Sequence, residues 1–261
     1  MRVDTWHRRS LFTLAALAGA ATACGAGEEK EPELSEDAEV IRYGDEVSQF
    51  GELTRPAGDE RGLVVVVHGG FWKPEFGIEY AQPLVPSLVD AGWATWVIEY
   101  RRGTGAEDTL GDVRAAIDAA PLQSATVVGL GHSAGGHLVT WAAAGGGLTH
   151  VVSQAGVLDL RAAHDAGLGS GAVAAFLGHP PGPDDADVDP IQQVPLDVPV
   201  WCVHGTGDTT VPPTQSRAYV DAATAAGATA ELIEVEGDHF AVIEPDTEAW
   251  ARQLELLDDL A

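Results

Sequence analysis

The sequence predicts an α/β fold in which a mostly parallel central sheet carries helices on both faces. Two observations lead to this class. Short apolar or β-branched segments alternate along the chain with segments of helical spacing, and several of the apolar segments contain no polar residue. A continuous apolar run is typical of a strand that is buried on both faces. Alternation of such strands with helices implies a parallel sheet with helices on either side.

The strands are expected at 40–43, 49–54, 63–67, 93–98, 126–130, 151–155, 199–203 and 231–235. The segment 63–67 is the clearest of them, because all five residues are apolar. Helices are expected at 78–90 in spite of Pro83 and Pro86, at 106–120 up to Pro121, from the turn at Gly131 through Ala144, and at 215–226 and 247–260. No internal repeat is present.

One stretch interrupts this alternation. Between 157 and 195 the chain is rich in Gly, Pro and Asp, with a short helix expected at 172–177. A loop of this length in a compact domain is usually functional or a small subdomain. We therefore expect a small cap-like insertion at about 157–195, near the functional site, within a single domain at 40–261.

Length and charge limit the size of the domain and the classes of partner that it can bind. A chain of 261 residues with 45% hydrophobic content can bury a large core within one domain. Lys+Arg 14 against Asp+Glu 40 gives a net charge of −26, which argues against nucleic acid or an anionic membrane surface as a partner. The acidic balance itself is explained by a solvated surface and says nothing of the fold.

The first residues have the layout of an export signal. The twin arginines Arg8 and Arg9 precede an apolar run at 11–23, which is too short to span a bilayer. The segment 1–23 is similar to the twin-arginine signal peptides of bacteria. Ala21-Thr22-Ala23-Cys24 is either a lipoprotein box that leads to lipidation of Cys24 or an ordinary Ala-x-Ala cleavage site.

We favour lipidation of Cys24, although a lipoprotein box usually has Leu where Ala21 stands. An acidic, proline-containing tether at 24–39 follows, and it would hold a domain away from a membrane. The expected location is therefore the outer face of the bacterial cell membrane, or the medium if the chain is released. Cys202, the other cysteine, lies in an apolar strand and is best explained as a small buried hydrophobic residue.

A candidate nucleophile stands between a predicted strand and a predicted helix. Gly131-His132-Ser133-Ala134-Gly135 matches the pattern Gly-x-Ser-x-Gly, with the strand 126–130 before it and a helix after it. A sharp strand-to-helix turn strains the serine backbone and lifts its hydroxyl above the sheet, and the glycines let strand and helix approach closely. Ser133 is therefore predicted to be a catalytic nucleophile.

A competing hypothesis makes the same turn a dinucleotide site. Gly129, Gly131 and Ala134 fit the loose Gly-x-Gly-x-x-Gly/Ala pattern. That site requires an acidic residue at the end of the next strand, and the next strand ends in Ser153-Gln154-Ala155. The dinucleotide hypothesis is accordingly set aside.

A glycine-containing loop follows the first buried strand and offers an oxyanion hole. His68-Gly69-Gly70-Phe71-Trp72 comes directly after 63–67. Acyl transfer develops a negative oxygen that needs backbone N–H donors, and glycines let the chain come close to it. The predicted donors are the amides of Gly70, Phe71 and Ala134, while His68 is expected to pin the loop.

The acid and the histidine follow late strands. His204-Gly205-Thr206-Gly207-Asp208 leaves the strand 199–203, which makes Asp208 the favoured acid. Asp159, just past the strand 151–155, is the competitor, and Asp238 is discounted because it adjoins the histidine. His239 is the only one of nine histidines that follows Asp208, as the chain order Ser, acid, His requires.

These residues predict a serine hydrolase. His239 takes the Ser133 proton, Ser133 attacks a carbonyl to form an acyl-enzyme that water releases, and Asp208 orients His239. His132 and His137 flank the nucleophile and are expected to be structural, since no His-Glu-x-x-His metal motif is present. No metal site is predicted.

Residues from about 40 to 250 resemble α/β-hydrolases that include kynurenine formamidase-like and feruloyl/acetyl-xylan esterase-like proteins. The matching pieces are His68-Gly69-Gly70-Phe71-Trp72, Glu99-Tyr100-Arg101, Gly131-His132-Ser133-Ala134-Gly135-Gly136-His137, Gly156-Val157-Leu158-Asp159-Leu160-Arg161 and His239-Phe240. The resemblance implies an α/β-hydrolase fold, the triad Ser133, Asp208 and His239, a structural turn role for Asp159, and no cofactor.

The expected substrate is a small acyl ester. An export signal argues against a cytosolic formamidase role, and exported relatives often cleave acyl esters, so we expect a carboxylic-ester hydrolase. Formamidase or other amide hydrolysis is the first alternative, and a peptidase related to prolyl oligopeptidases is the second. A non-catalytic binding protein is the alternative from another class, and the intact triad argues against it.

Overall fold

The computed structural model describes residues 38–260. The predicted signal peptide at 1–23, Cys24 and most of the tether at 24–39 lie outside the described residues. Within residues 38–260, no helix is both long and apolar enough to cross a membrane.

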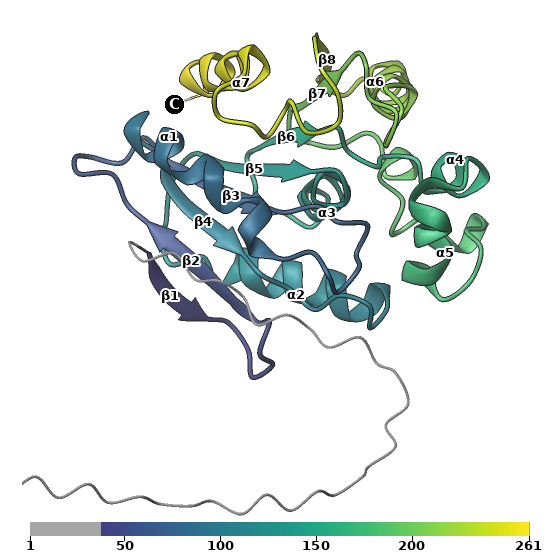
Figure 1. Ribbon diagram of the computed structural model, residues 1–261, viewed down its shortest axis with the longest axis horizontal. Helices are drawn as coiled ribbons and strands as arrows, with labels where there is room; N and C mark the ends of the chain where they lie inside the picture. The colour runs from purple at the N-terminus through teal and green to yellow at the C-terminus, as the bar shows by residue number, and fades with distance from the viewer. Residues whose placement is uncertain (1–37, 261) are drawn as a thin grey trace, which may run out of the picture.

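One eight-stranded sheet organises the molecule (Figure 1), and its strand order is β1-β2-β4-β3-β5-β6-β7-β8. β2 pairs antiparallel with both of its neighbours, β1 and β4, and every other pair of neighbouring strands is parallel, which confirms the predicted, mostly parallel sheet. The strands are β1 Glu39–Arg42, β2 Phe50–Thr54, β3 Leu63–Val67, β4 Ala94–Ile98, β5 Val127–His132, β6 His150–Gln154, β7 Val200–Gly205 and β8 Ala230–Val235.

Helices cover both faces of this sheet. They are α1 Val85–Asp90, α2 Ala106–Asp118, α3 Ala134–Ala143, α4 Leu160–Asp165, α5 Ala172–Leu177, α6 Thr214–Ala225 and α7 Glu248–Asp258. Because side chains alternate along a strand, Val65 and Val67 of β3 join the core under α2, α3 and α6, whereas Val64 and Val66 join the core under α1 and α7. All five residues of β3 are buried, as expected of a strand covered on both faces.

The helix expected at 78–90 is broken in the structure. Two short 3-10 turns, Ile78–Tyr80 and Gln82–Leu84, precede α1, which begins only at Val85. Pro83 lies in the first turn of the second 3-10 helix and Pro86 in the first turn of α1. Proline has no N–H to donate and fits best at the start of a helix, so each proline begins a new element here instead of continuing one.

The segment 157–195 contains the expected helix α5 and one that the sequence did not predict, α4. The side chain of Asp159 accepts a hydrogen bond from the backbone N of Ala162 (2.8 Å) and thereby caps the N-terminus of α4. Three short 3-10 helices, Leu168–Ser170, Pro183–Asp185 and Pro190–Gln192, complete the segment.

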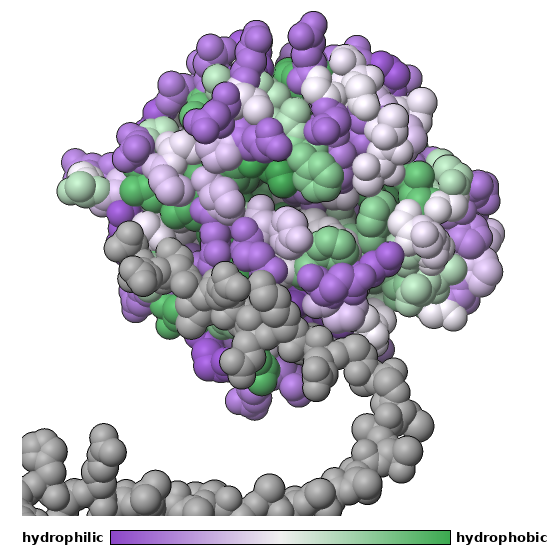
Figure 2. Space-filling model, in the orientation of Figure 1, coloured by the Kyte–Doolittle hydropathy of each residue, from purple (hydrophilic) through white to green (hydrophobic). Residues whose placement is uncertain are grey.

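The surface agrees with the acidic composition. On the face in Figure 2, hydrophilic side chains border most of the outline, and the hydrophobic areas lie between them in smaller patches. Only four large hydrophobic side chains are classed as exposed among the described residues, and two of them, Tyr80 and Phe240, line the pocket described below.

Candidate active site

Ser133 occupies a strained turn between β5 and α3. Its backbone angles, φ 55° and ψ −116°, fall in a region that side-chain-bearing residues rarely adopt. The turn is tied down, because the Ser133 amide donates to the Gln154 carbonyl (2.8 Å) and its carbonyl accepts from His137 N and Val157 N (3.2 Å each). The strain is thus held by the surrounding backbone, as a nucleophile elbow requires.

The glycines on either side of Ser133 are required by close backbone approach. A Cβ atom at Gly131 would lie 2.2 Å from the Gly135 carbonyl oxygen, and one at Gly135 would lie 2.1 Å from the Val67 carbonyl oxygen. Backbone atoms cannot move aside as flexible side chains can. The Gly-x-Ser-x-Gly pattern is therefore explained by the contact of α3 with β5 and β3.

Asp208 and His239 are joined by a short hydrogen bond. Asp208 follows β7, His239 follows β8, and the Nδ1 atom of His239 lies 2.6 Å from Oδ2 of Asp208. The other carboxylate oxygen, Oδ1, accepts from the backbone N of Thr210 (2.8 Å) and of Val211 (2.9 Å). Since both carboxylate oxygens accept hydrogen bonds, Asp208 is held as the partner of the His239 ring.

The carboxyl group of Asp208 is kept in its charged form. Burial by itself raises its pKa, but hydrogen bonds from His204 and His239 outweigh burial, and the pKa lies below its ordinary value. An ionised Asp208 requires the hydrogen on Nδ1 of His239, which leaves Nε2 of that ring free to accept a proton.

Ser133 and His239 line one pocket, together with Gly70 and Phe71 of the loop after β3. Among the described residues, no hydrogen bond joins the Ser133 hydroxyl to the His239 ring. Hydrogen bonds between nucleophile and base are often long without substrate and tighten when the reacting complex forms. The structure thus places the three predicted residues at one sheet edge, with one of their two hydrogen bonds formed.

The competing acids have other roles. Asp159 caps α4, and the Oδ1 atom of Asp238 accepts from the backbone N of Phe240 (2.9 Å) and of Ala241 (3.2 Å). Neither carboxylate forms a hydrogen bond with His239 within the described part of the chain. Asp208 alone of the three is bonded to the histidine ring.

The loop after β3 is anchored by a buried charged cluster. The His68 ring lies 3.1 Å from Oε1 of Glu99, and Arg102 also forms an ion pair with this carboxylate. Tyr100 donates its hydroxyl hydrogen to the His68 carbonyl (2.8 Å) and stacks on the His68 ring. Burial and the nearby Arg102 guanidinium lower the pKa of His68 to about 3, as suits a structural role.

This anchoring explains the backbone of the predicted oxyanion loop. Gly70 (φ 115°) and Phe71 (φ 52°) both have positive φ, and no backbone hydrogen bond of the described residues uses either amide as a donor. Ala134 is the first residue of α3, where helix N–H groups have no partner within the helix. The three predicted donors thus come from a strained loop and a helix start beside Ser133, as an oxyanion hole requires.

The pocket above Ser133 is small and largely apolar, with a volume of about 260 Å³. Three of its residues were not predicted from the sequence: Phe76, Tyr80 and Thr210. Phe76 and Tyr80 lie between the oxyanion loop and α1, where the broken helix brings them over the pocket. The proline pair that interrupts the helix was the only sequence signal for this turn. The other lining residues are Gly69, Gly70, Phe71, His132, Ser133, His239 and Phe240.

Both histidines beside Ser133 form ring contacts with backbone carbonyl oxygens. The Nε2 atom of His132 lies 2.9 Å from the His239 carbonyl oxygen, so this ring supports the histidine loop. Burial and the neighbouring His239 lower the pKa of His132 to about 3. The Nε2 atom of His137 lies 2.9 Å from the Val188 carbonyl oxygen and links α3 to the segment 157–195.

Cys202 is a buried, free thiol on β7, as predicted. Burial raises its pKa to about 12, so the reactive thiolate is not formed at neutral pH. In the described residues, no group of three or more His, Cys, Asp or Glu side chains is arranged to hold a metal ion.

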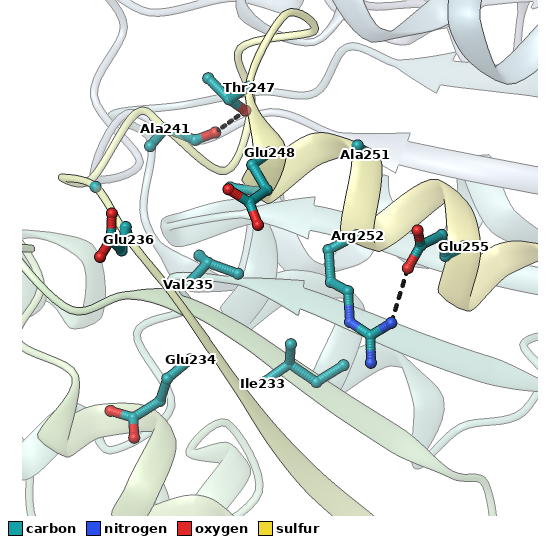
Figure 3. Close-up of a pocket in the computed structure, with 12 residues that line it drawn as sticks. Ile233, Glu234, Val235, Glu236, Ala241, Thr247, Glu248, Ala251, Arg252 and Glu255 are labelled. Atoms are coloured by element: carbon teal, nitrogen blue, oxygen red, sulfur yellow. Dashed lines mark hydrogen bonds and ion pairs between the residues drawn. The ribbon is translucent and has the colours of Figure 1, made fainter.

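A larger groove of about 870 Å³ lies elsewhere, between β8 and α7 (Figure 3). Glu248, Arg252 and Glu255 line its α7 side, where Arg252 pairs with Glu255 (2.7 Å). Glu234 and Glu236 line its β8 side, and the Glu234 side chain points away from α7 and pairs with Arg217 of α6. Ser133, Asp208 and His239 are not among its lining residues. The charged groups along this edge strand discourage pairing with another strand.

The fold and the site together define a serine hydrolase of the α/β-hydrolase class. The chain belongs to the prolyl oligopeptidase family, whose model matches residues 90–258. That match includes Ser133, Asp208 and His239 and begins after the oxyanion loop. No curated protein sequence matches this chain.

Several solved structures similar to this chain are described as esterases. A truncated carbohydrate esterase from gut microbiota is 20% identical, covers 87% of this chain and 98% of its own, and has a TM-score of 0.74. Esterase 2 of the planctomycete Thermogutta terrifontis, phosphoramylated by tabun, is 25% identical over 87% of this chain and 94% of its own, with a TM-score of 0.71. The same esterase with propionate bound has 25% identity over 86% and 93% and a TM-score of 0.69.

Proposed function

We propose that this protein hydrolyses small, neutral carboxylic esters with a short acyl group, with Ser133, His239 and Asp208 as its catalytic triad. The observation that carries the proposal is the 2.6 Å hydrogen bond from His239 to Asp208, because this same His239 lines one apolar pocket with the strained Ser133. The esterases of similar structure support ester cleavage over other acyl transfers.

The first half-reaction forms an acyl-enzyme. The Oγ atom of Ser133 bonds to the ester carbonyl carbon while its proton passes to Nε2 of His239. The carbonyl oxygen becomes negative and accepts hydrogen bonds from the amides of Gly70 or Phe71 and of Ala134. The C–O bond to the alcohol then breaks, and His239 returns the proton to the departing oxygen.

Water completes the cycle. It attacks the acyl carbon while His239 takes a proton from it, the bond to Ser133 breaks, and Ser133 recovers its hydrogen. Asp208 stays ionised throughout, holds the His239 ring by Nδ1 and stabilises the ring when it is positively charged. Each proton that leaves Ser133 or water therefore passes through a single ring.

The pocket supports a short, uncharged acyl group. The pocket volume of about 260 Å³ lies just below the range of about 300–1,000 Å³ that is usual for small-molecule sites. Phe71, Phe76, Tyr80 and Phe240 contribute apolar walls, and neither Asp, Glu, Lys nor Arg is among the residues that line it. A charged acyl group would lose its hydration there without finding a counter-ion. The Thermogutta esterase of similar structure binds propionate.

A panel of p-nitrophenyl esters tests this proposal. We expect kcat/KM to be greatest for acetate to butyrate and to fall by at least roughly tenfold for decanoate, because a long chain cannot fit the pocket. An anionic succinate monoester should be poor for the reason given above. Equal rates with decanoate and acetate, or preference for the anionic ester, would contradict the proposed acyl preference. The Ser133→Ala variant gives the background rate of hydrolysis that is subtracted from each measurement.

Peptide hydrolysis is the second candidate, because the chain belongs to the prolyl oligopeptidase family. Chromogenic prolyl anilides and N-formyl amides, assayed beside the esters, separate the candidates. We expect ester kcat/KM to exceed that of either amide class. A prolyl anilide cleaved faster than every ester would replace ester hydrolysis with peptidase activity while leaving the triad in place.

Export and lipidation belong to this proposal as well. The twin-arginine segment and Cys24 support an enzyme tethered to the outer face of the cell membrane. In a bacterial host that processes lipoproteins, the full chain should incorporate labelled palmitate and sediment with membranes, and Cys24→Ser should do neither. Release of the wild-type protein into the medium without label would count against the tether.

A further inference from the structure

Asp208 touches a second histidine that the triad does not use. His204 lies at the end of β7, four residues before Asp208, and is completely buried. Its Nε2 atom lies 3.2 Å from Oδ2 of Asp208, the same oxygen that lies 2.6 Å from Nδ1 of His239. One carboxylate oxygen is therefore held between two imidazole rings.

The surroundings of His204 fix which ring nitrogen carries its hydrogen. Besides Asp208, its Nε2 atom faces the Val211 carbonyl oxygen at 2.8 Å, and neither oxygen has a hydrogen to give. Its Nδ1 atom faces the hydroxyl of Ser216 at 2.7 Å, and Ser216, on α6, is also completely buried. A hydroxyl can donate where a carbonyl or a carboxylate cannot. Ser216 therefore donates to Nδ1, and Nε2–H points at Asp208 and Val211.

We infer that His204 is a positioning residue: the two oxygens that face Nε2 set its tautomer, Ser216 satisfies Nδ1, and the ring holds the carboxylate of Asp208 in the orientation that His239 requires. The backbone amides of Thr210 and Val211 fix Oδ1. The Nε2–H group of His204 has the Val211 carbonyl oxygen as its nearer acceptor (2.8 Å) and also lies 3.2 Å from Oδ2, so it is the second polar side-chain contact of that oxygen. Without His204, Oδ2 keeps only the histidine that it has to orient. The inference rests on the proposed triad and adds to it the two buried residues His204 and Ser216.

The consequence is kinetic more than structural. A carboxylate fixed on both oxygens has little freedom to rotate when His239 gains and loses its proton, so less reorganisation accompanies each transfer. Substrate does not reach His204, because it is not among the pocket residues. Loss of His204 should therefore lower kcat and leave KM nearly unchanged.

Two substitutions at His204 separate positioning from packing. His204→Phe keeps a ring and removes the donor, and we expect it to lower kcat for p-nitrophenyl acetate roughly 10- to 100-fold, with KM changed less than about threefold. His204→Gln can place an amide N–H near the position of Nε2, and it should return kcat to within about fivefold of wild type. A Phe variant with wild-type kcat, or a Gln variant as slow as Phe, would overturn the inference.

A double-mutant cycle shows whether His204 acts through Asp208. In an Asp208→Asn background, His204→Phe should cause less than about a twofold further loss of kcat, because the group that it positions is already defective. The same fold-loss in both backgrounds would overturn the inference, since a purely structural contribution adds. Ser216→Ala removes the donor to Nδ1 without touching Asp208, and it should lower kcat roughly three- to tenfold.

The proton between His239 and Asp208 gives a readout that does not depend on turnover. A short, charge-assisted N–H···O bond of this kind gives a far-downfield proton resonance in NMR spectra. We expect this resonance in wild type and His204→Gln, and its broadening or loss in Ser216→Ala and His204→Phe. If His204→Phe does not fold, the test uses Ser216→Ala instead. An unchanged resonance together with an unchanged kcat in Ser216→Ala would overturn the inference. If the resonances follow this pattern but the wild-type protein hydrolyses no ester, the proposed function is wrong and the positioning role of His204 stands.

Discussion

Ser133→Ala is expected to lower kcat by about five to six orders of magnitude, since the acyl-enzyme cannot form without the Oγ atom. The measurement is steady-state hydrolysis of p-nitrophenyl acetate by the purified variant. The fold should survive, because the Ser133 hydroxyl forms no hydrogen bond among the described residues and alanine keeps the Cβ atom at this strained position. The melting temperature should therefore equal or exceed that of wild type.

Residual activity would be informative. An oxyanion hole and substrate binding alone still accelerate hydrolysis over water in other serine hydrolases, so a small remainder is expected. A loss of less than about a hundredfold, in a preparation free of contaminating esterases, would instead mean that another group attacks the carbonyl. His239→Ala should then have little effect as well.

Asp208→Asn carries the second large effect, a fall in kcat of about 10⁴-fold. In wild type, Oδ2 accepts a hydrogen bond from His239 and contacts Nε2 of His204 at 3.2 Å, while Oδ1 accepts from two backbone amides. An asparagine offers a single oxygen and no charge, so it cannot satisfy both sides or stabilise a positively charged His239. Stability should also fall by about 1–3 kcal/mol, measured by denaturant unfolding, because buried donors lose their acceptor.

Asp159→Asn is the matched control. Asp159 caps α4 through Ala162 N, and asparagine caps helices about as well as aspartate, so kcat should change less than about twofold. A large loss with Asp159→Asn and a small one with Asp208→Asn would make Asp159, at the N-terminus of α4, the catalytic acid. The comparison uses the same chemical change at both positions.

The charge of Asp208 also links the site to pH. Its pKa is lower in the folded protein than in the unfolded chain, because hydrogen bonds to His204 and His239 outweigh the effect of burial. A carboxyl with a depressed pKa stabilises the fold at neutral pH. That contribution is present above the ordinary carboxyl pKa and is lost as the pH falls through the lower folded value. Asp208 therefore stays ionised at neutral and mildly acidic pH.

Much of the fold could be predicted because its strands are simple apolar runs. β3 and the helix α5 have the predicted bounds, and the other strands differ from prediction by one or two residues at an end. The interval 78–90 could not be resolved in this way. The apolar spacing there predicts one continuous helix, whereas the two prolines predict a break. The structure has the break, with a 3-10 helix at Gln82–Leu84 and α1 beginning at Val85.

The site residues that follow predicted strands could be predicted, and those that lie on loops could not. Ser133, Asp208 and His239 each follow a predicted strand, so the carboxyl edge of a parallel sheet places them together. Tyr80 and Thr210 carry no motif, and their place in the pocket depends on how loops fold over the sheet. His204 was visible beside Asp208 in the sequence, but its role follows only from the ring geometry around Oδ2.

The central claim is that Ser133 is an activated nucleophile, and covalent labelling tests it most directly. Native protein is treated with a fluorophosphonate, digested and analysed by tandem mass spectrometry, with Ser133→Ala and heat-unfolded protein as controls. The Thermogutta esterase of similar structure forms an adduct with tabun, another organophosphorus reagent. We predict one phosphonylated peptide, modified at Ser133, in native wild type and in neither control. Folded protein that stays unlabelled at Ser133, or is labelled at another serine, would contradict it.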